Sequence, residues 1–182
     1  KCGWVMPELI VDSKSGISGA GATPSPITHF VNRYENFTAY NIGVHRHIPE
    51  MEQELSLLAG SNISVIFSPH LLPINRGMLS TMYLSLKGAK GAKGAKSVKT
   101  QDELSLLYQE FYQDKSFIRL LDRIPQTADV RETNYCDIWV NLDKRTNKVI
   151  VVSAIDNLTK GASGQAVQNM NIMYGWDEGL GF

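Results

Sequence analysis

The sequence has few cysteines, no net charge and no long apolar run. Its 182 residues include only two cysteines, Cys2 and Cys136, and neither belongs to a metal-ligand spacing. We expect two thiols in a reducing compartment, with a disulfide between them as the alternative. Lysine and arginine (18) balance aspartate and glutamate (18), so the basic surplus typical of nucleic-acid or anionic-membrane binding is missing. No apolar run reaches the length of a membrane span. Neither nucleic acid nor a membrane is therefore expected as a partner.

Signals at the start of the chain are also missing. The first seven residues contain no apolar stretch of the signal-peptide type, and the chain begins with Lys1 rather than Met. That start favours a fragment or a processed product. A nucleotide-binding βαβ unit is missing as well, because the glycines between Ser15 and Gly21 do not open a helix that follows a strand and precedes an acidic residue.

The composition that remains, 43% hydrophobic and 20% charged, is typical of an ordinary globular domain. Apolar and β-branched runs predict strands over 8–13, 37–42, 62–67, 78–86, 135–142 and 148–155. Helices are predicted over 49–60, up to Tyr112 from a capping box at Thr100–Glu103, and over 161–174. In the first helix, Met51, Leu55 and Leu58 share one face. The order predicts an α+β fold with a mixed, largely antiparallel sheet and helices on one face.

The segment from Lys87 to Lys96 contains the tripeptide GAK three times in tandem. A repeat this short cannot bury a core unit. We interpret it as a solvated surface insertion, since loops tolerate expansion. Binding of an anion by its lysines is the alternative.

Two of the four histidines lie two residues apart in VHRHIPE (44–50), just ahead of a predicted helix. In an extended segment, His45 and His47 point to one side and Arg46 to the other. Three interpretations stay open. A metal site would need a third ligand, which has no suitable spacing nearby. Acid–base catalysis suits histidine, because it titrates near neutral pH. The third interpretation is a surface or packing pair.

Two glycine-rich segments are candidate binding elements. SGISGAG (15–21) is predicted to be a loop with unusual dihedral angles, whose exposed N–H groups can bind a phosphate or carboxylate. DNLTKGASGQ (156–165) begins the last predicted helix with small residues, which let a ligand come close to a helix N-terminus. Close packing of that helix against a neighbour explains the same small residues equally well.

Five blocks in one order resemble the N-acetyl-gamma-glutamyl-phosphate reductases. They are SKSGISGAG (13–21), HRHIPEMEQ (45–53), FSPHLLPINRGMLSTMY (67–83), TNYCDI (133–138) and DNLTKGASGQAVQNMN (156–171). The similarity spans nearly the whole chain. A looser one, in the SGAG-like loop and the DNL-KGA helix, is to aspartate-semialdehyde dehydrogenases. The resemblance implies the C-terminal catalytic and dimerisation part of such an enzyme, with a glyceraldehyde-phosphate-dehydrogenase-like fold. Residues 1–155 would form the substrate and dimerisation domain, and residues 156–182 a C-terminal helix that returns to a nucleotide-binding domain.

The chemistry implied by the resemblance is NADPH-dependent reduction of N-acetyl-glutamyl 5-phosphate to N-acetyl-glutamate 5-semialdehyde, in arginine biosynthesis. It further implies NADP as cofactor, a homo-oligomer (dimer or tetramer), and the cytoplasm as location, or an organellar matrix in a eukaryote. A cysteine thiolate attacks the acyl phosphate, hydride reduces the thioester, and a histidine moves protons. The family's Asn-Pro-Gly-Cys motif and Rossmann region are expected ahead of Lys1, because neither occurs here. Cys2 lacks the preceding Asn-Pro-Gly, and Cys136 is expected to be packed.

The resemblance also implies site residues. His47 is the expected general acid/base, with His45 as the runner-up. The expected substrate-binding residues are Arg46, Arg76 and Ser15. The expected cofactor-binding residues are Ser18, Gly19, Asn157, Ala162 and Gln165. One departure is Arg131–Glu132–Thr133, which stands where the family usually has glycine after arginine and puts a charge near the site.

Two alternative functions stay open. The chain could be a non-catalytic dimerisation module from a truncated paralogue, or part of a reductase for a related acyl phosphate, aminoadipyl or aspartyl. Coding sequence upstream of Lys1 with the cysteine motif would remove the first alternative, and a substrate panel would test the second.

Overall fold

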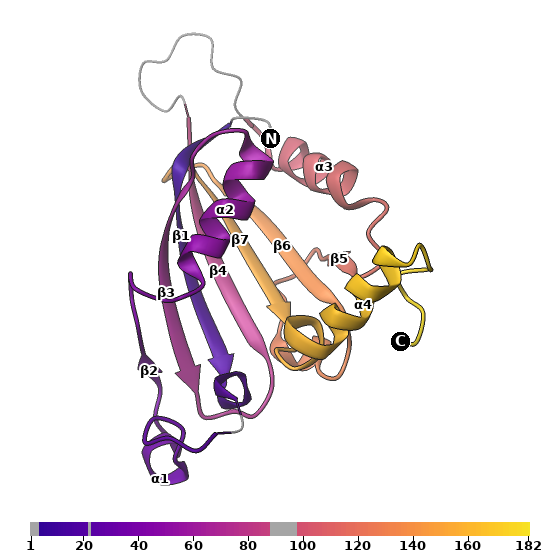
Figure 1. The fold of residues 1–182 in the computed structure, drawn as a ribbon. Coiled ribbons are helices and arrows are strands. Elements are labelled where there is room, and N and C mark those ends of the chain that lie inside the picture. The colour runs from indigo at the N-terminus through magenta and orange to yellow at the C-terminus, as the bar shows by residue number, and fades with distance from the viewer. Residues whose placement is uncertain (1–3, 22, 88–97) are drawn as a thin grey trace.

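A seven-stranded sheet forms the centre of the computed structural model, which describes residues 4–21, 23–87 and 98–182 (Figure 1). The strand order is β2-β3-β1-β4-β7-β6-β5. The strands are β1 (Val5–Gly16), β2 (Thr38–Ala39), β3 (Ser64–Leu72), β4 (Met78–Leu86), β5 (Ile118–Leu120), β6 (Cys136–Asp143) and β7 (Lys148–Ile155). The pairs β1–β3 and β5–β6 are parallel and the other pairs are antiparallel. The predicted mixed, largely antiparallel sheet is therefore confirmed.

The helices are α1 (Phe30–Arg33), α2 (Ile48–Ala59), α3 (Gln101–Tyr112) and α4 (Gly164–Met173). Figure 1 shows α2, α3 and α4 on the same side of the sheet. Two 3₁₀ turns, η1 (Ile17–Ala20) and η2 (Thr127–Val130), and one π turn, η3 (Thr159–Ser163), complete the elements. No helix of the described ranges is long and apolar enough to cross a bilayer. Cys2 and the GAK repeat lie outside the described residues.

The predicted helix boundaries agree with the structure at three points. Pro49 lies in the first turn of α2, and Gly60 ends that helix in the left-handed conformation (φ 68°, ψ 21°). Before α3, the Thr100 hydroxyl accepts the Glu103 N–H at 3.2 Å, and the Glu103 carboxylate accepts the Thr100 N–H at 3.3 Å. Both arms of the predicted capping box are therefore present.

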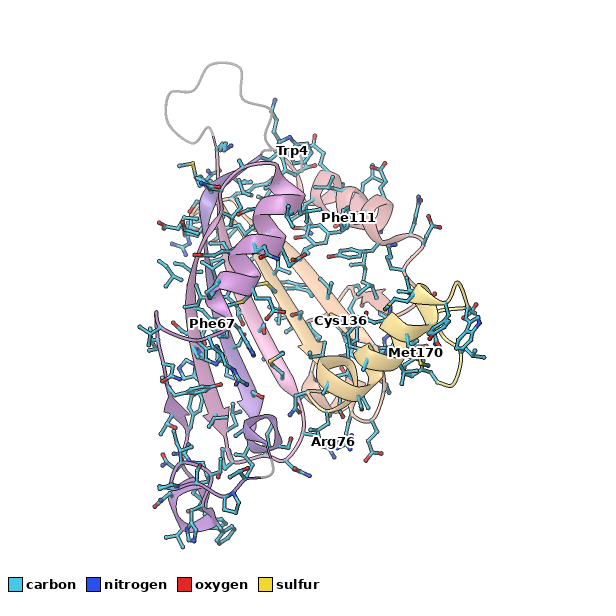
Figure 2. The ribbon with its side chains drawn as sticks, viewed as in Figure 1. Trp4, Phe67, Arg76, Phe111, Cys136 and Met170 are labelled. Atoms are coloured by element: carbon cyan, nitrogen blue, oxygen red, sulfur yellow. The ribbon has the colours of Figure 1, made fainter. Side chains whose placement is uncertain are left out.

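The core lies between the sheet and the helices in two clusters. Under α2, the buried side chains of β1 and β3 pack against Ile48, Met51 and Leu55. Under α3, a second cluster includes Leu104 and Ile138, and Cys136 packs against it from β6 (Figure 2). Burial alternates along β1 and β3, so one face of these strands is covered and the other is open.

The open face of the sheet carries an apolar patch. Ile10, Ile66 and Tyr83 are direct neighbours on β1, β3 and β4, and their exposed fractions are 37%, 46% and 36%. We call these three residues the open-face patch. Large apolar side chains side by side on an exposed sheet face are typical of a surface that binds another protein.

Several predictions about extent were wrong. β2 has two residues instead of the predicted six, β3 continues past the predicted end at residue 67 to Leu72, and β5 was not predicted. The predicted loop at 15–21 is wrong in its first half, because Ser15 and Gly16 are the last residues of β1. Gly16 must be glycine for a different reason: a Cβ there would lie 2.5 Å from the Asn75 carbonyl oxygen. A strand of three residues, such as β5, is too short to show an alternating pattern.

Candidate functional site

The turn η1 after β1 is held by backbone and side-chain hydrogen bonds. Gly16 N–H donates to the Gly77 carbonyl and Ile17 N–H to the Ile74 carbonyl, both at 2.9 Å. The Ser18 hydroxyl donates to the Asn75 carbonyl at 2.5 Å. Two of the N–H groups that were expected to face a ligand are therefore used within the fold, which corrects the prediction of a loop with exposed donors.

Asn157 connects this turn to the segment that follows β7. Its Nδ2 donates to the Ser18 hydroxyl at 2.9 Å, and its Oδ1 accepts the Gly77 N–H at 2.7 Å. Gly19 lies beside the same amide: a Cβ there would lie 3.1 Å from the Ser15 hydroxyl and 3.5 Å from Asn157 Nδ2. The structure therefore brings Ser15, Ser18, Gly19 and Asn157 together. We call these four residues the serine–asparagine group.

Asp156 precedes Asn157 in the sequence, and Arg76 lies between Asn75 and Gly77, whose backbones contact Ser18 and Asn157. Asp156 is fully buried, and its Oδ2 is 3.0 Å from Arg76 Nη1. The Arg76 side chain keeps 29% of its surface exposed, so the guanidinium is paired with Asp156 and still reaches the surface near the turn that joins β3 to β4 (Figure 2). Sequence reasoning proposed Arg76 for a substrate anion and missed Asp156, its buried partner.

The histidine pair occupies a turn, so the placement of His45 and His47 on one side that would hold for an extended segment does not apply. His47 is the residue before α2 (φ −85°, ψ −7°), and its N–H donates to His45 Nδ1 at 3.2 Å. The two rings are nevertheless neighbours, with centroids 4.8 Å apart. Arg46 is exposed.

His45 is the less exposed of the two histidines. Its ring lies against Tyr40 and Phe67, with centroids 5.5 and 5.2 Å away. Burial, followed by the neighbouring His47 and Arg46, lowers the pKa of His45 below its ordinary value of 6.5. The hydrogen bonds and ring contacts of the described residues do not join this pair to the serine–asparagine group.

The small residues of the DNLTKGASGQ segment form the π turn η3 and the start of α4. Ala162 is exposed within η3, and Gln165 in α4 donates to the Asn169 side chain at 2.8 Å. Gly164 packs closely, since a Cβ there would lie 2.2 Å from Asn134 Oδ1. The packing interpretation therefore holds at Gly164, whereas Ala162 is open to the surface and the approach of a ligand there stays a prediction.

Cys136 is packed, as expected. Burial raises the pKa of its thiol to about 11, although the Lys160 ammonium group acts in the opposite direction. A thiol of that kind is a poor nucleophile near neutral pH. Among the described residues, no group of three or more His, Cys, Asp or Glu side chains is arranged to hold a metal ion.

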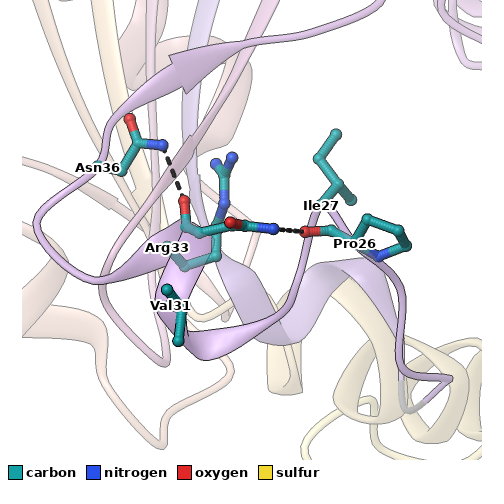
Figure 3. A pocket seen from close by; sticks show the side chains of 6 residues that line it. Pro26, Ile27, Val31, Arg33 and Asn36 are labelled. Carbon is teal, nitrogen blue, oxygen red and sulfur yellow. Dashed lines mark hydrogen bonds between the residues drawn. The ribbon is translucent and has the colours of Figure 1, made fainter.

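Two surface depressions lie elsewhere. One, of about 570 Å³, is bounded by Pro26, Ile27, Val31, Asn32, Arg33 and Asn36 (Figure 3). The other, of about 440 Å³, lies between α3 and β6 and includes Gln101 and Trp139. Neither is lined by a candidate site residue, so the serine–asparagine group does not sit in either of them.

Comparison with known proteins identifies the family. The family described as "semialdehyde dehydrogenase, dimerisation domain" matches residues 1–157. The chain belongs to this family. Four of its five sequence blocks lie within the matched residues, and the fifth, 156–171, begins where the match ends.

Relatives within this family carry a more specific name. The chain is 51% identical to an N-acetyl-gamma-glutamyl-phosphate reductase of Thermoanaerobacter sp., over 100% of this chain and 51% of that protein. It is 53% identical to the reductase of the same name from Geobacter metallireducens, over 95% of this chain and 48% of that protein. The chain therefore spans about half the length of the relatives that it matches.

Solved structures support the fold of this semialdehyde dehydrogenase domain. Aspartate semialdehyde dehydrogenase II from Vibrio cholerae superposes with a TM-score of 0.65 over 92% of this chain and 55% of that chain, at 15% identity. A probable aspartate-semialdehyde dehydrogenase from Pseudomonas aeruginosa gives the same values. At this identity the likeness concerns the fold alone, and it agrees with the predicted fold class.

Proposed function

We propose that the protein containing this chain is an N-acetyl-gamma-glutamyl-phosphate reductase, which reduces N-acetyl-glutamyl 5-phosphate to N-acetyl-glutamate 5-semialdehyde with NADPH in arginine biosynthesis. The observation that carries the proposal is identity of about half over essentially the whole chain to proteins of that name. We expect the reaction in the cytoplasm, or in an organellar matrix if the source is a eukaryote.

This chain would supply one wall of the active site. In the fold, the Ser15 hydroxyl donates to the Gly16 carbonyl, the Ser18 hydroxyl to the Asn75 carbonyl and one Asn157 N–H to Ser18. A phosphate or carboxamide would take a serine hydroxyl from its present partner, or bind the second amide hydrogen of Asn157. Arg76, and Arg46 at the turn before α2, are candidates for a carboxylate or phosphate of the substrate.

NADP fits this wall in one respect. A Cβ at Gly19 would crowd the Ser15 hydroxyl at 3.1 Å, so glycine suits this position, and its exposed backbone is open to the approach of a flat group. In the proposed reaction NADPH supplies a hydride. Ser18, Gly19, Asn157, Ala162 and Gln165 would bind and orient the cofactor at the start of η3 and α4, where the exposed Ala162 leaves room.

The histidine pair would donate and accept protons in the proposed reaction. His47 is exposed at the start of α2, so a substrate can reach its ring, and we assign it as the general acid/base. His45 Nδ1 accepts the His47 N–H, which leaves Nε2 as the protonated nitrogen of its neutral ring. His45 is thus the second candidate, and it also fixes the turn that presents His47.

The nucleophilic cysteine and most of the nucleotide pocket would come from the part of the protein that this chain does not span. Cys136 does not fit the nucleophile, because its thiol is packed and its pKa is raised. We further propose that residues 156–182 pack against that other part, and that the open-face patch pairs two copies into a homo-oligomer.

The experiment is an NADPH oxidation assay on the full-length protein with N-acetyl-glutamyl, aminoadipyl and aspartyl phosphates. Turnover with the first in clear excess over the other two is expected. A preference for aminoadipyl or aspartyl phosphate would assign the related reductase instead. No turnover with any of the three would support the non-catalytic dimerisation module.

A further inference from the structure

The buried carboxylate of Asp156 connects three separate segments of the chain. Oδ2 accepts from Arg76 Nη1 at 3.0 Å and from the Glu132 N–H at 2.8 Å. Oδ1 accepts from the N–H groups of Leu158 and Thr159 at 2.8 and 3.2 Å. These donors belong to the turn between β3 and β4, to the segment after η2, and to the start of η3.

The chemistry of these contacts requires a charged carboxylate. Burial acts to raise the pKa of Asp156, but the N–H groups of Glu132, Leu158 and Thr159 and the Arg76 guanidinium together hold it below its ordinary value. All four partners are donors, so both oxygens must accept. An amide in place of the carboxylate would turn an NH₂ group toward two of these donors.

Asn157, the next residue, extends these hydrogen bonds to the candidate site. Its amide accepts the Gly77 N–H and donates to the Ser18 hydroxyl, and Ser18 in turn donates to the Asn75 carbonyl. Asp156 therefore fixes the backbone from which the Asn157 amide reaches η1. Neither Asp156 oxygen is exposed to a ligand, because the side chain is fully buried.

We propose that Asp156 is a positioning residue for the reductase reaction: its carboxylate holds Arg76, the backbone at Glu132 and the start of η3 in one arrangement. Through Asn157 it also positions η1, so that the serine–asparagine group meets phosphate and cofactor in register. This inference rests on the proposed function for the reaction, but the arrangement itself can be tested without activity. Misplacement of binding groups by about 1 Å lowers turnover by about a hundredfold.

A second buried aspartate provides a matched control. Asp137 on β6 pairs with Arg119, with Oδ1 2.6 Å from Nε and Oδ2 2.9 Å from Nη2. It is buried like Asp156. Asp137 and Arg119 contact none of the serine–asparagine group, so Asp137→Asn breaks a comparable buried ion pair away from the candidate site.

The experiment compares Asp156→Asn, Asp156→Glu and Asp137→Asn in the full-length protein by hydrogen exchange, thermal unfolding and steady-state kinetics. In Asp156→Asn, peptides covering 16–21 and 157–164 should exchange faster, and kcat should fall about 10- to 100-fold. Asp137→Asn should lower Tm about as much as Asp156→Asn does, while its kcat stays within about twofold of wild type. Asp156→Glu keeps the charge but moves it by one methylene, so it should also lower kcat by about tenfold.

Three results would overturn the proposal. The first is equal loss of kcat in the two Asn variants at equal loss of Tm, which would mean that Asp156 only stabilises the fold. The second is unchanged exchange at 16–21 in Asp156→Asn. The third is full activity of Asp156→Glu. If the wild-type protein turns over none of the acyl phosphates, the proposed function fails, whereas the exchange comparison still decides whether Asp156 holds η1 and η3.

Discussion

At the scale of single residues, the two histidines differ in what surrounds them. His45 is enclosed by Tyr40, Phe67 and His47 and uses Nδ1 to accept a backbone N–H. His47 is exposed at the start of α2. A group that exchanges protons with a substrate must be within hydrogen-bond reach of it, and an exposed ring meets that requirement more easily than an enclosed one.

The first prediction therefore concerns His47. In the full-length protein, His47→Ala should lower kcat by about two to four powers of ten, the usual effect of removing a general acid/base. His45→Ala should lower kcat less, because the His45 ring stabilises the turn by packing against Tyr40 and Phe67. Steady-state kinetics with N-acetyl-glutamyl phosphate measure both. A larger loss in His45→Ala than in His47→Ala would reverse the assignment.

The second prediction concerns the Cys136 thiol. With a pKa of about 11, about one thiol in a thousand is ionised at pH 8. In a Cys2→Ser version of the 182-residue chain, Cys136 should react with Ellman's reagent far more slowly than a small free thiol. Unfolding in urea should bring the rate up to that of the small thiol. Rapid reaction of the folded chain would mean that Cys136 is accessible and ionised.

Residue types alone could identify some of these positions but not their contacts. The spacing of HRH indicates the two histidines as candidates, but it does not predict the turn that brings their rings together. For Glu132, the residue type was noticed in the sequence, but the role of its backbone was not. It has φ 61°, in the left-handed region that glycine adopts easily, at the position where the family usually has glycine. The sequence showed a new charge there, whereas the structure shows that the backbone N–H of Glu132 is what Asp156 binds.

At the scale of elements, the capped helices were the most predictable part of the fold. The ends of α2 and the start of α3 follow from Pro49, Gly60 and the capping box, because these residues satisfy or terminate backbone hydrogen bonds locally. The buried face of α2 was less predictable. Ile48, Met51 and Leu55 pack on the sheet, while Leu58, which was predicted on the same face, is 47% exposed. Which apolar residues of a helix are covered depends on where the sheet ends, and local spacing does not contain that information.

The edge of β6 shows an element contact that no local pattern predicts. β5 ends at Leu120, opposite Ile138, so beyond that point β6 has a strand on its β7 side but none on the other side. There the Gln101 side chain takes the place of a strand: Nε2 donates to the Val140 carbonyl at 3.0 Å, and Oε1 accepts the Leu142 N–H at 2.8 Å. Covering a free edge in this way limits pairing with other chains.

The third prediction follows from this contact. Gln101→Ala should lower the free energy of unfolding by about 1–3 kcal/mol, because two backbone groups of β6 lose their partner. Urea unfolding of the 182-residue chain measures the change. Gln109→Ala, an exposed glutamine on the same helix, is the control and should stay within about 0.5 kcal/mol of wild type. Equal effects of the two substitutions would show that the Gln101 contact does not stabilise β6.

At the scale of the whole molecule, composition and periodicity predicted an α+β fold but not its strand order. The parallel pairing of β1 with β3 brings the end of β1 next to the turn after β3, and β7 ends on the same side at Ile155, just before Asp156. Residues 15–19, 75–77 and 156–157 therefore meet although they are far apart in the sequence. Only the resemblance to a family, which carries the three-dimensional arrangement implicitly, anticipated that these blocks belong to one site.

The two faces of the sheet differ in what covers them. One face carries α2, α3 and α4 (Figure 1), so the other is available for pairing. The open-face patch exposes three large side chains, with Ile10 on β1 paired in register with Ile66 on β3 and Tyr83 on β4, and covering apolar surface contributes about 25 cal/mol per Å². In a two-fold dimer each residue of such a patch is used twice, so one charged substitution introduces two buried charges.

The fourth prediction is that Ile66→Glu in the full-length protein converts the oligomer into smaller species, because two carboxylates buried without partners oppose the association. Sedimentation velocity at micromolar concentration measures the mass. Leu106→Glu, on the exposed side of α3 and 54% exposed, adds the same charge away from the open face and should sediment like wild type. If Ile66→Glu also sediments like wild type, the subunits pair through another surface. The open-face patch would then bind some other protein.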